Sequence, residues 1–156
     1  MTPRRPIIGV IGSGQCAGPI HKIALEVGQE IARRDAVLVC GGLGGVMEAA
    51  AEGAAREGGL TVGILPGPSI HHANPYIRIP IATDMGHARN VIIAHTADAL
   101  VAVAGGSGTL SEIGHALKIG KPVIGLRTIP NLERVQYMNT AQEAVACAFE
   151  ILGVSA

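Results

Sequence analysis

The chain has 156 residues, which predicts a single domain over residues 1–156 that is long enough to bury a hydrophobic core. Its 12 basic and 12 acidic side chains cancel to a formal net charge of zero without a basic block, and this argues against a nucleic-acid partner. The apolar runs are of strand length and residues 1–6 do not resemble a signal peptide, so we expect no membrane partner and a cytoplasmic location.

Short apolar runs alternate with longer helical stretches along the whole chain. This pattern is typical of βαβ units and predicts an α/β, Rossmann-like, doubly wound fold with a mostly parallel sheet flanked by helices. The predicted strands are 7–11, 36–40, 61–65, 77–79, 99–104 and 123–126. The predicted helices are 19–34, 46–57, 86–95, 110–119 and 140–152.

The first predicted strand is followed by a glycine-containing loop, residues 12–18. Its third glycine comes one residue too late for the dinucleotide fingerprint, and the second strand ends in Cys40 rather than in the acid that would bind ribose hydroxyls. An NAD or FAD domain is therefore not expected. Glycine still lets the backbone approach a ligand, so Ser13 and Gly14 are candidate contacts.

The cysteines and histidines do not form a recognisable framework. Cys16, Cys40 and Cys147 are widely spaced and odd in number, which favours neither disulfides nor a zinc site. Cys40 is expected in the core, and packing is also favoured over ligand contact for Cys16. The six histidines lack metal-binding spacing, so no metal site is expected, although His87 is placed to line a pocket.

A second glycine cluster follows the second predicted strand and precedes a helix. These glycines either let a ligand approach the backbone or allow close packing of helix on sheet. The cluster consists of Gly41, Gly42, Gly44 and Gly45. Further along, residues 66–75 form the longest loop with glycine, proline and histidine, whose role the sequence leaves open.

The predicted helix at 86–95 carries Arg89 and Asn90 in its first turns. A surface salt bridge would explain the arginine alone. A guanidinium that faces a glycine loop would instead form bidentate bonds to a phosphate, with the Asn90 amide as a hydrogen-bonding companion.

The most informative segment joins the buried strand at 99–104 to the next helix. Convergent backbone N–H groups and the first turn of a helix bind phosphate, and this loop lacks the lysine of an ATP-hydrolysing P-loop. Glu112 follows Thr109 by three residues, which is the spacing of a capping box, and a residue with this role can also contact a ligand. The candidate phosphate-binding residues here are Gly105, Gly106, Ser107, Gly108 and Thr109.

Three segments occur in a characteristic order: GGLGGVME at 41–48, TDMGHARN at 83–90 and GGSGTLSE at 105–112. Together they resemble the superfamily once labelled "possible lysine decarboxylase", which includes the Lonely Guy type phosphoribohydrolases and the molybdenum cofactor carrier proteins. The resemblance covers nearly the whole chain. It implies that Arg89 and Glu112 match the hydrolase catalytic pair, and that Ser13 and Gly14 contact a base or a pterin.

Within that superfamily the chain resembles the carrier branch more closely. The hydrolase motifs have proline where this chain has Ala104 and lysine where it has Asn90. The resemblance thus implies binding of a phosphorylated heterocyclic small molecule, with molybdenum cofactor as cargo and no cofactor required. The alternatives are a nucleoside 5′-monophosphate hydrolase, in which Glu112 and Arg89 are catalytic, and a sensor of nucleotide-derived ligands. Relatives assemble, so a homodimer or homotetramer is expected.

Overall fold

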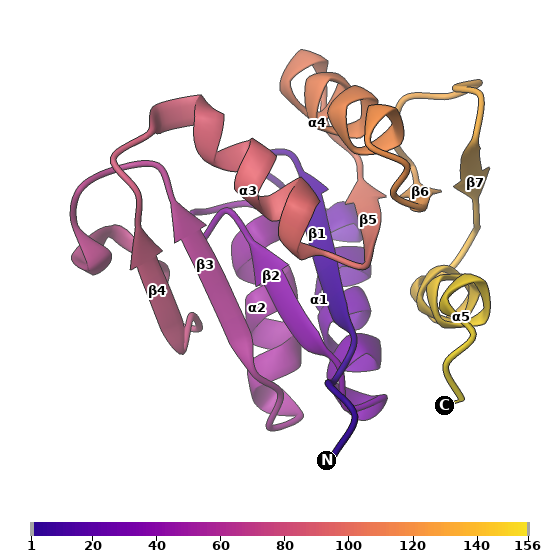
Figure 1. Ribbon diagram of the computed structural model, residues 1–156, viewed down its shortest axis with the longest axis horizontal. Coiled ribbons are helices and arrows are strands. Elements are labelled where there is room, and N and C mark those ends of the chain that lie inside the picture. The colour runs from indigo at the N-terminus through magenta and orange to yellow at the C-terminus, as the bar shows by residue number, and fades with distance from the viewer. Residues whose placement is uncertain (1, 156) are drawn as a thin grey trace.

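The computed structural model describes residues 2–155, which form a seven-stranded sheet flanked by helices (Figure 1). The strand order is β4-β3-β2-β1-β5-β6-β7, and every neighbouring pair is parallel. The strands are β1 (Ile7–Gly12), β2 (Val37–Cys40), β3 (Thr61–Leu65), β4 (Ile79–Ala82), β5 (Ala99–Val103), β6 (Val123–Leu126) and β7 (Val135–Tyr137). The α-helices are α1 (Gly18–Arg33), α2 (Val46–Arg56), α3 (Arg89–Thr96), α4 (Ser107–Lys118) and α5 (Ala141–Leu152), with short 3₁₀ turns η1 (Ile70–His72) and η2 (Gly86–Ala88).

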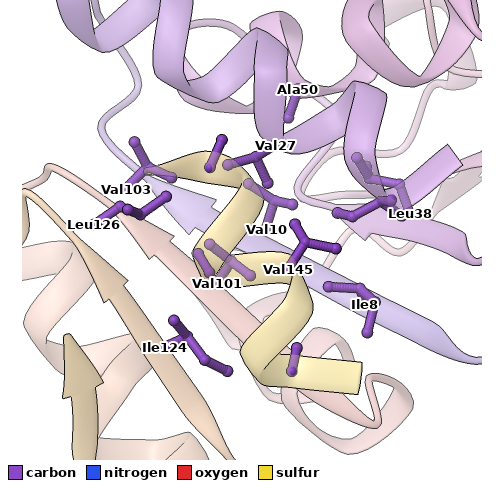
Figure 2. Close-up of a cluster of buried hydrophobic side chains, with 14 of the residues drawn as sticks. Ile8, Val10, Val27, Leu38, Ala50, Val101, Val103, Ile124, Leu126 and Val145 are labelled. Atoms are coloured by element: carbon purple, nitrogen blue, oxygen red, sulfur yellow. The ribbon is translucent and has the colours of Figure 1, made fainter. Parts of the chain in front are cut away.

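The helices cover both faces of the sheet because the central strands are apolar on both sides. Alternate residues of β1 and β5 join two separate core clusters, one with α1, α2 and α5 and the other with α3 and α4. Figure 2 shows part of the first cluster, in which Val10, Val101 and Val145 lie together. The predicted doubly wound α/β fold is therefore confirmed.

Helices α1 and α2 pack backbone against backbone. A Cβ on Gly28 would lie 1.8 Å from the carbonyl oxygen of Ala50, and one on Gly53 would lie 1.9 Å from that of Leu25. Both positions therefore require glycine, and the two helices approach more closely than larger side chains would allow.

The sheet places a crevice between β1 and β5. From β1 the chain builds outward to β4, and it then returns to start β5 on the other side of β1. The connections that leave the carboxyl ends of β1 and β5 consequently run to opposite faces, which opens the position where ligands of doubly wound proteins bind. The loop from Ser13 and the loop from Ala104 both begin there.

Several element boundaries differ from the predictions. The edge strand β4 covers Ile79–Ala82 rather than 77–79, and β7 was not predicted. Helix α4 begins at Ser107 rather than at residue 110, and the helix expected from residue 86 is a 3₁₀ turn followed by α3. Across residues 2–155, none of the helices has the length and apolar character needed to cross a bilayer.

Candidate functional site

A cavity of about 400 Å³ opens at the crevice between β1 and β5. Its lining residues come from the ends of these strands, the start of α4 and the first turn of α3. The candidate residues among those that line it are Ser13, Gly14, Gly41, Arg89, Asn90, Gly106, Ser107, Gly108, Thr109 and Glu112. His87 also lines it, and so do Gly12 of the first glycine loop and Met47 of the GGLGGVME segment. Val10, Ile11 and Ile93 line it too, and for these the sequence predicts only strand or helix positions.

The amino terminus of α4 faces this cavity without a side-chain cap. The helix begins after Gly106, no side chain accepts a hydrogen bond from its first turn, and that turn contains no acidic residue. Its N–H groups and the positive end of the helix dipole are therefore available to an anion. The space above Gly106 and Gly108 is also open, because a Cβ on either would meet nothing within 4 Å.

The capping-box interpretation of Glu112 is wrong. It required Thr109 to precede the helix, whereas Thr109 lies in the first turn of α4 and is buried. Glu112 instead accepts a hydrogen bond of 3.3 Å from the Nδ2 amide of Asn90. Burial raises the pKa of the Glu112 carboxyl, and the nearby positive charge of Arg89 opposes that shift.

Arg89 is held beneath the cavity by the protein backbone. Its side chain is buried, with the residue 7% exposed, and Nε donates to the carbonyl of Ile64 at 2.8 Å. Nη2 donates to the carbonyl of Gly41 at 3.4 Å, and Nη1 donates to Oδ1 of Asn90. Among residues 2–155, Arg89 forms no salt bridge, so the surface ion pair that would have explained it is not seen. Burial lowers the pKa of this guanidinium, and the negative charge of Glu112 opposes the shift. Glu112 therefore offsets only part of the cost of burying the positive charge.

Asn90 connects the two charged groups. Its Oδ1 accepts from Arg89 while its Nδ2 donates to Glu112, so the amide has a single orientation that satisfies both contacts. The amide thus separates the guanidinium from the carboxylate and fixes each of them at the cavity wall.

Four candidate glycines do not line the cavity. A Cβ on Gly45 would lie 2.3 Å from the carbonyl oxygen of Ser13, and one on Gly42 would lie 2.7 Å from Leu65. Gly44 lies beside the backbone of Gly14, and Gly105 lies against Thr109. These four glycines pack against neighbouring backbone or side chains and are not exposed to the cavity. Gly41, by contrast, lines the cavity.

The loop at residues 66–75 supports the second glycine turn instead of lining the cavity. The Nδ2 amide of Asn74 donates to the carbonyl of Leu43 at 2.8 Å, and the Asn74 backbone N–H donates to the carbonyl of Gly42 at 2.9 Å. The first loop is tied down in a similar way, because the Val46 N–H at the start of α2 donates to the carbonyl of Ser13. The Ser13 hydroxyl itself donates to the Gln15 carbonyl.

The cysteines lie away from the cavity. Cys40 is fully buried at the end of β2, and burial raises the pKa of its thiol to about 11. Cys16 lines a separate small cavity beside Glu48 and Glu52, and its pKa is raised, first by burial. Within residues 2–155, no group of three or more His, Cys, Asp or Glu side chains has an arrangement that would hold a metal ion.

Fold and cavity together define a Rossmann-like α/β protein with a polar cavity at the point where the strand order reverses. The chain belongs to the SLOG cluster4 family, whose sequence profile matches residues 5–150. A protein of Archaeoglobus fulgidus is 53% identical over 138 residues, which cover 88% of this chain and 91% of the relative.

Two proteins of similar structure are described as molybdenum cofactor proteins. The molybdenum cofactor binding protein of Rippkaea orientalis superposes with a TM-score of 0.90 and 38% identity, over 97% of this chain and 99% of that one. The molybdenum cofactor carrier protein of Chlamydomonas reinhardtii gives 0.89 and 38%, over 96% and 99%. A cytokinin riboside 5′-monophosphate phosphoribohydrolase of Mycobacterium tuberculosis is 36% identical over 69% of this chain and 65% of its own length. The expected membership of the superfamily is therefore confirmed.

Proposed function

We propose that this protein binds and carries the molybdenum cofactor, a phosphorylated pterin, as its cargo. The observation that carries the proposal is the structural similarity to the binding protein and the carrier protein for this cofactor. In each case the similarity extends over almost the entire length of this chain and of the relative. The phosphoribohydrolase relative matches a smaller share of either sequence.

The geometry supports a phosphate at the start of α4. The N–H groups of its first turn have no side-chain cap, two glycines leave the space beside them open, and Arg89 adds a buried positive charge to the lining of the cavity. Because Arg89 already donates to three protein acceptors, it is positioned before any ligand arrives. A preorganised anion site of this kind loses little conformational freedom on binding.

Cargo binding is tested by loading. The protein is mixed under anaerobic conditions with molybdenum cofactor released from a molybdoenzyme, separated from free cofactor by gel filtration, and oxidised so that the fluorescent pterin is measured. We expect the pterin to elute with the protein, and the protein to restore activity when added to a cofactor-free molybdoenzyme. Elution of all pterin in the free fraction would overturn the proposal.

A variant with an added negative charge tests whether the cargo binds at the amino terminus of α4. Gly108→Asp places a carboxylate in the proposed phosphate position, and an acidic residue in the first turn of a helix does not destabilise it. We expect this variant to fold and to lose the cargo. Gly114→Asp makes the same change farther along α4, where the glycine lines neither the cavity nor a packed contact, and should retain the cargo.

The second candidate is hydrolysis of a nucleoside 5′-monophosphate to base and ribose 5-phosphate. It is favoured by Glu112, whose partly buried carboxyl with a raised pKa lies in the same cavity as the glycine loop and Arg89. Incubation with AMP and chromatography of the products tests it. Release of adenine that is lost in Glu112→Gln would establish the hydrolase and displace the carrier proposal, whereas absence of adenine would remove the hydrolase.

A further inference from the structure

A second cavity, of about 290 Å³, lies between α3 and α4. It shares His87, Asn90, Gly108 and Glu112 with the first cavity, so the two spaces adjoin at these residues. Its remaining lining residues are Val91 from α3 and Ser111 and His115 from α4. The site described above therefore has a side compartment that extends beyond the residues proposed to bind phosphate.

The sequence of α4 builds one wall of this compartment. Gly108, Ser111, Glu112 and His115 follow the spacing of one helix face, since residues three and four apart lie on the same side of a helix. The face thus presents open space at its start and then a hydroxyl, a carboxylate and an imidazole. In a pocket for a small molecule, a few convergent polar groups of this kind fix the orientation of the ligand and provide specificity.

One nitrogen of the His115 ring is buried without a hydrogen-bond partner. Its Nε2 is the buried side-chain nitrogen or oxygen that lacks a hydrogen-bond partner among residues 2–155. Its ring packs edge-on against His95, with ring centroids 5.9 Å apart, and that contact provides no hydrogen bond. An unsatisfied buried polar atom costs free energy, so a hydrogen-bonding partner from a ligand in the compartment would be favourable.

We infer that this compartment binds the amino-substituted heterocycle of the ligand whose phosphate lies at the start of α4. This inference rests on the proposed function and specifies where the non-phosphate end of the ligand is recognised. Glu112 accepts from the amino and ring N–H groups of the heterocycle, and His115 provides the partner for an adjacent ring atom. Ser111, Val91 and His115 then determine specificity for the heterocycle, because they line the side compartment and not the phosphate-binding cavity.

Two commercially available probes separate the two ends of the ligand. Guanosine 5′-monophosphate carries the 2-amino-4-oxopyrimidine ring that pterins also contain, whereas ribose 5-phosphate has the phosphate without a heterocycle. Both are titrated calorimetrically into the wild type, Ser111→Leu, which fills the compartment, and His115→Phe, which removes the polar edge. Gly114→Leu is the matched control, because it adds the same side chain to α4 at a glycine that lines neither cavity.

We expect the wild type and Gly114→Leu to bind the nucleotide at least about tenfold more tightly than ribose 5-phosphate, since a bound heterocycle adds more than about 1.4 kcal/mol. In Ser111→Leu and His115→Phe this ratio should fall toward one while the affinity for ribose 5-phosphate stays unchanged. Equal affinities in the wild type, or an unchanged ratio in Ser111→Leu, would overturn the compartment but leave the phosphate site intact. Binding of neither probe would overturn the phosphate site itself and the compartment with it.

Discussion

The side chain of Arg89 lies where a side chain at position 41 would have to be, so Gly41 is the residue that makes room for it. A Cβ on Gly41 would lie 2.5 Å from Nη2 of Arg89 and 2.7 Å from Sδ of Met47, so the guanidinium occupies the space that a side chain would need. The same Nη2 donates to the Gly41 carbonyl. The two residues are far apart in the sequence, and the fold makes each of them a requirement of the other.

Gly41→Ala should therefore disturb both stability and binding. The added methyl group must displace a guanidinium that backbone carbonyls hold in place, so we expect a loss of about 1–3 kcal/mol in the free energy of unfolding. Affinity for ribose 5-phosphate should also fall. Urea denaturation and calorimetric titration measure the two effects. As a control, Gly114→Ala adds a methyl group in open space on a helix and should increase the free energy of unfolding by about 0.5–1 kcal/mol. A Gly41→Ala protein that is as stable as the wild type would contradict the tight fit between Gly41 and Arg89.

Gly53→Ala should be more damaging, because its neighbour is backbone. The Cβ would lie 1.9 Å from the carbonyl oxygen of Leu25, and α1 and α2 would have to separate to admit it. We expect a loss at or above the upper end of the roughly 1–3 kcal/mol that overpacking costs, without a direct effect on the distant cavity. Thermal unfolding monitored by circular dichroism measures this loss. An unchanged midpoint would show that the two helices do not pack as closely as described.

Asn90→Asp should weaken anion binding. The new carboxylate would pair with Arg89 and repel Glu112, so less positive charge would remain for a phosphate. Loss of the bond to Glu112 and the new negative charge together should lower the affinity for ribose 5-phosphate by about tenfold or more. Asn90→Gln keeps the amide and serves as the comparison. Equal affinity of Asn90→Asp and wild type would argue against a phosphate near Arg89.

The ionisation of Glu112 should be visible in the pH dependence of stability. Burial raises the pKa of this carboxyl above its ordinary value of 4.5, so the folded protein binds the proton more tightly than the unfolded chain. The resulting stabilisation is complete below the unfolded pKa and is lost as the pH rises through the folded pKa. Glu112→Gln cannot ionise, and relative to the wild type its free energy of unfolding should increase between about pH 4.5 and neutrality. A difference that stays constant over this range would contradict the raised pKa.

Much of the fold follows from local pattern. The runs at Ile7–Gly12 and Ala99–Val103 are apolar on both faces, which predicted central parallel strands correctly. Strand β7 was missed because it has three residues, of which Val135 alone is buried. The predicted range of β4 was wrong because Pro80 interrupts the strand pattern. Proline is tolerated at this position because β4 is an edge strand.

The candidate site was predictable to the level of loops but not of individual contacts. Parallel topology brings the ends of β1 and β5 together, and this placed Ser13 and Gly106 on one cavity as expected. Local sequence could not distinguish the glycines that face the cavity from those, such as Gly45, that pack against another loop. The helix start was also misplaced, because Gly106 ends the loop without the polar cap that a sequence pattern requires.

The anchoring of Arg89 also restricts the movement of α3. Two of its bonds fasten the first turn of α3 to the carbonyls of Ile64 and Gly41, at the ends of β3 and β2. Swinging the helix outward would break both of these bonds and leave the buried carbonyls of Ile64 and Gly41 without the donor that Arg89 provides, which is costly. For the proposed ligand we therefore expect entry and exit without an outward movement of α3, so that its dissociation rate is determined by its contacts with the cavity.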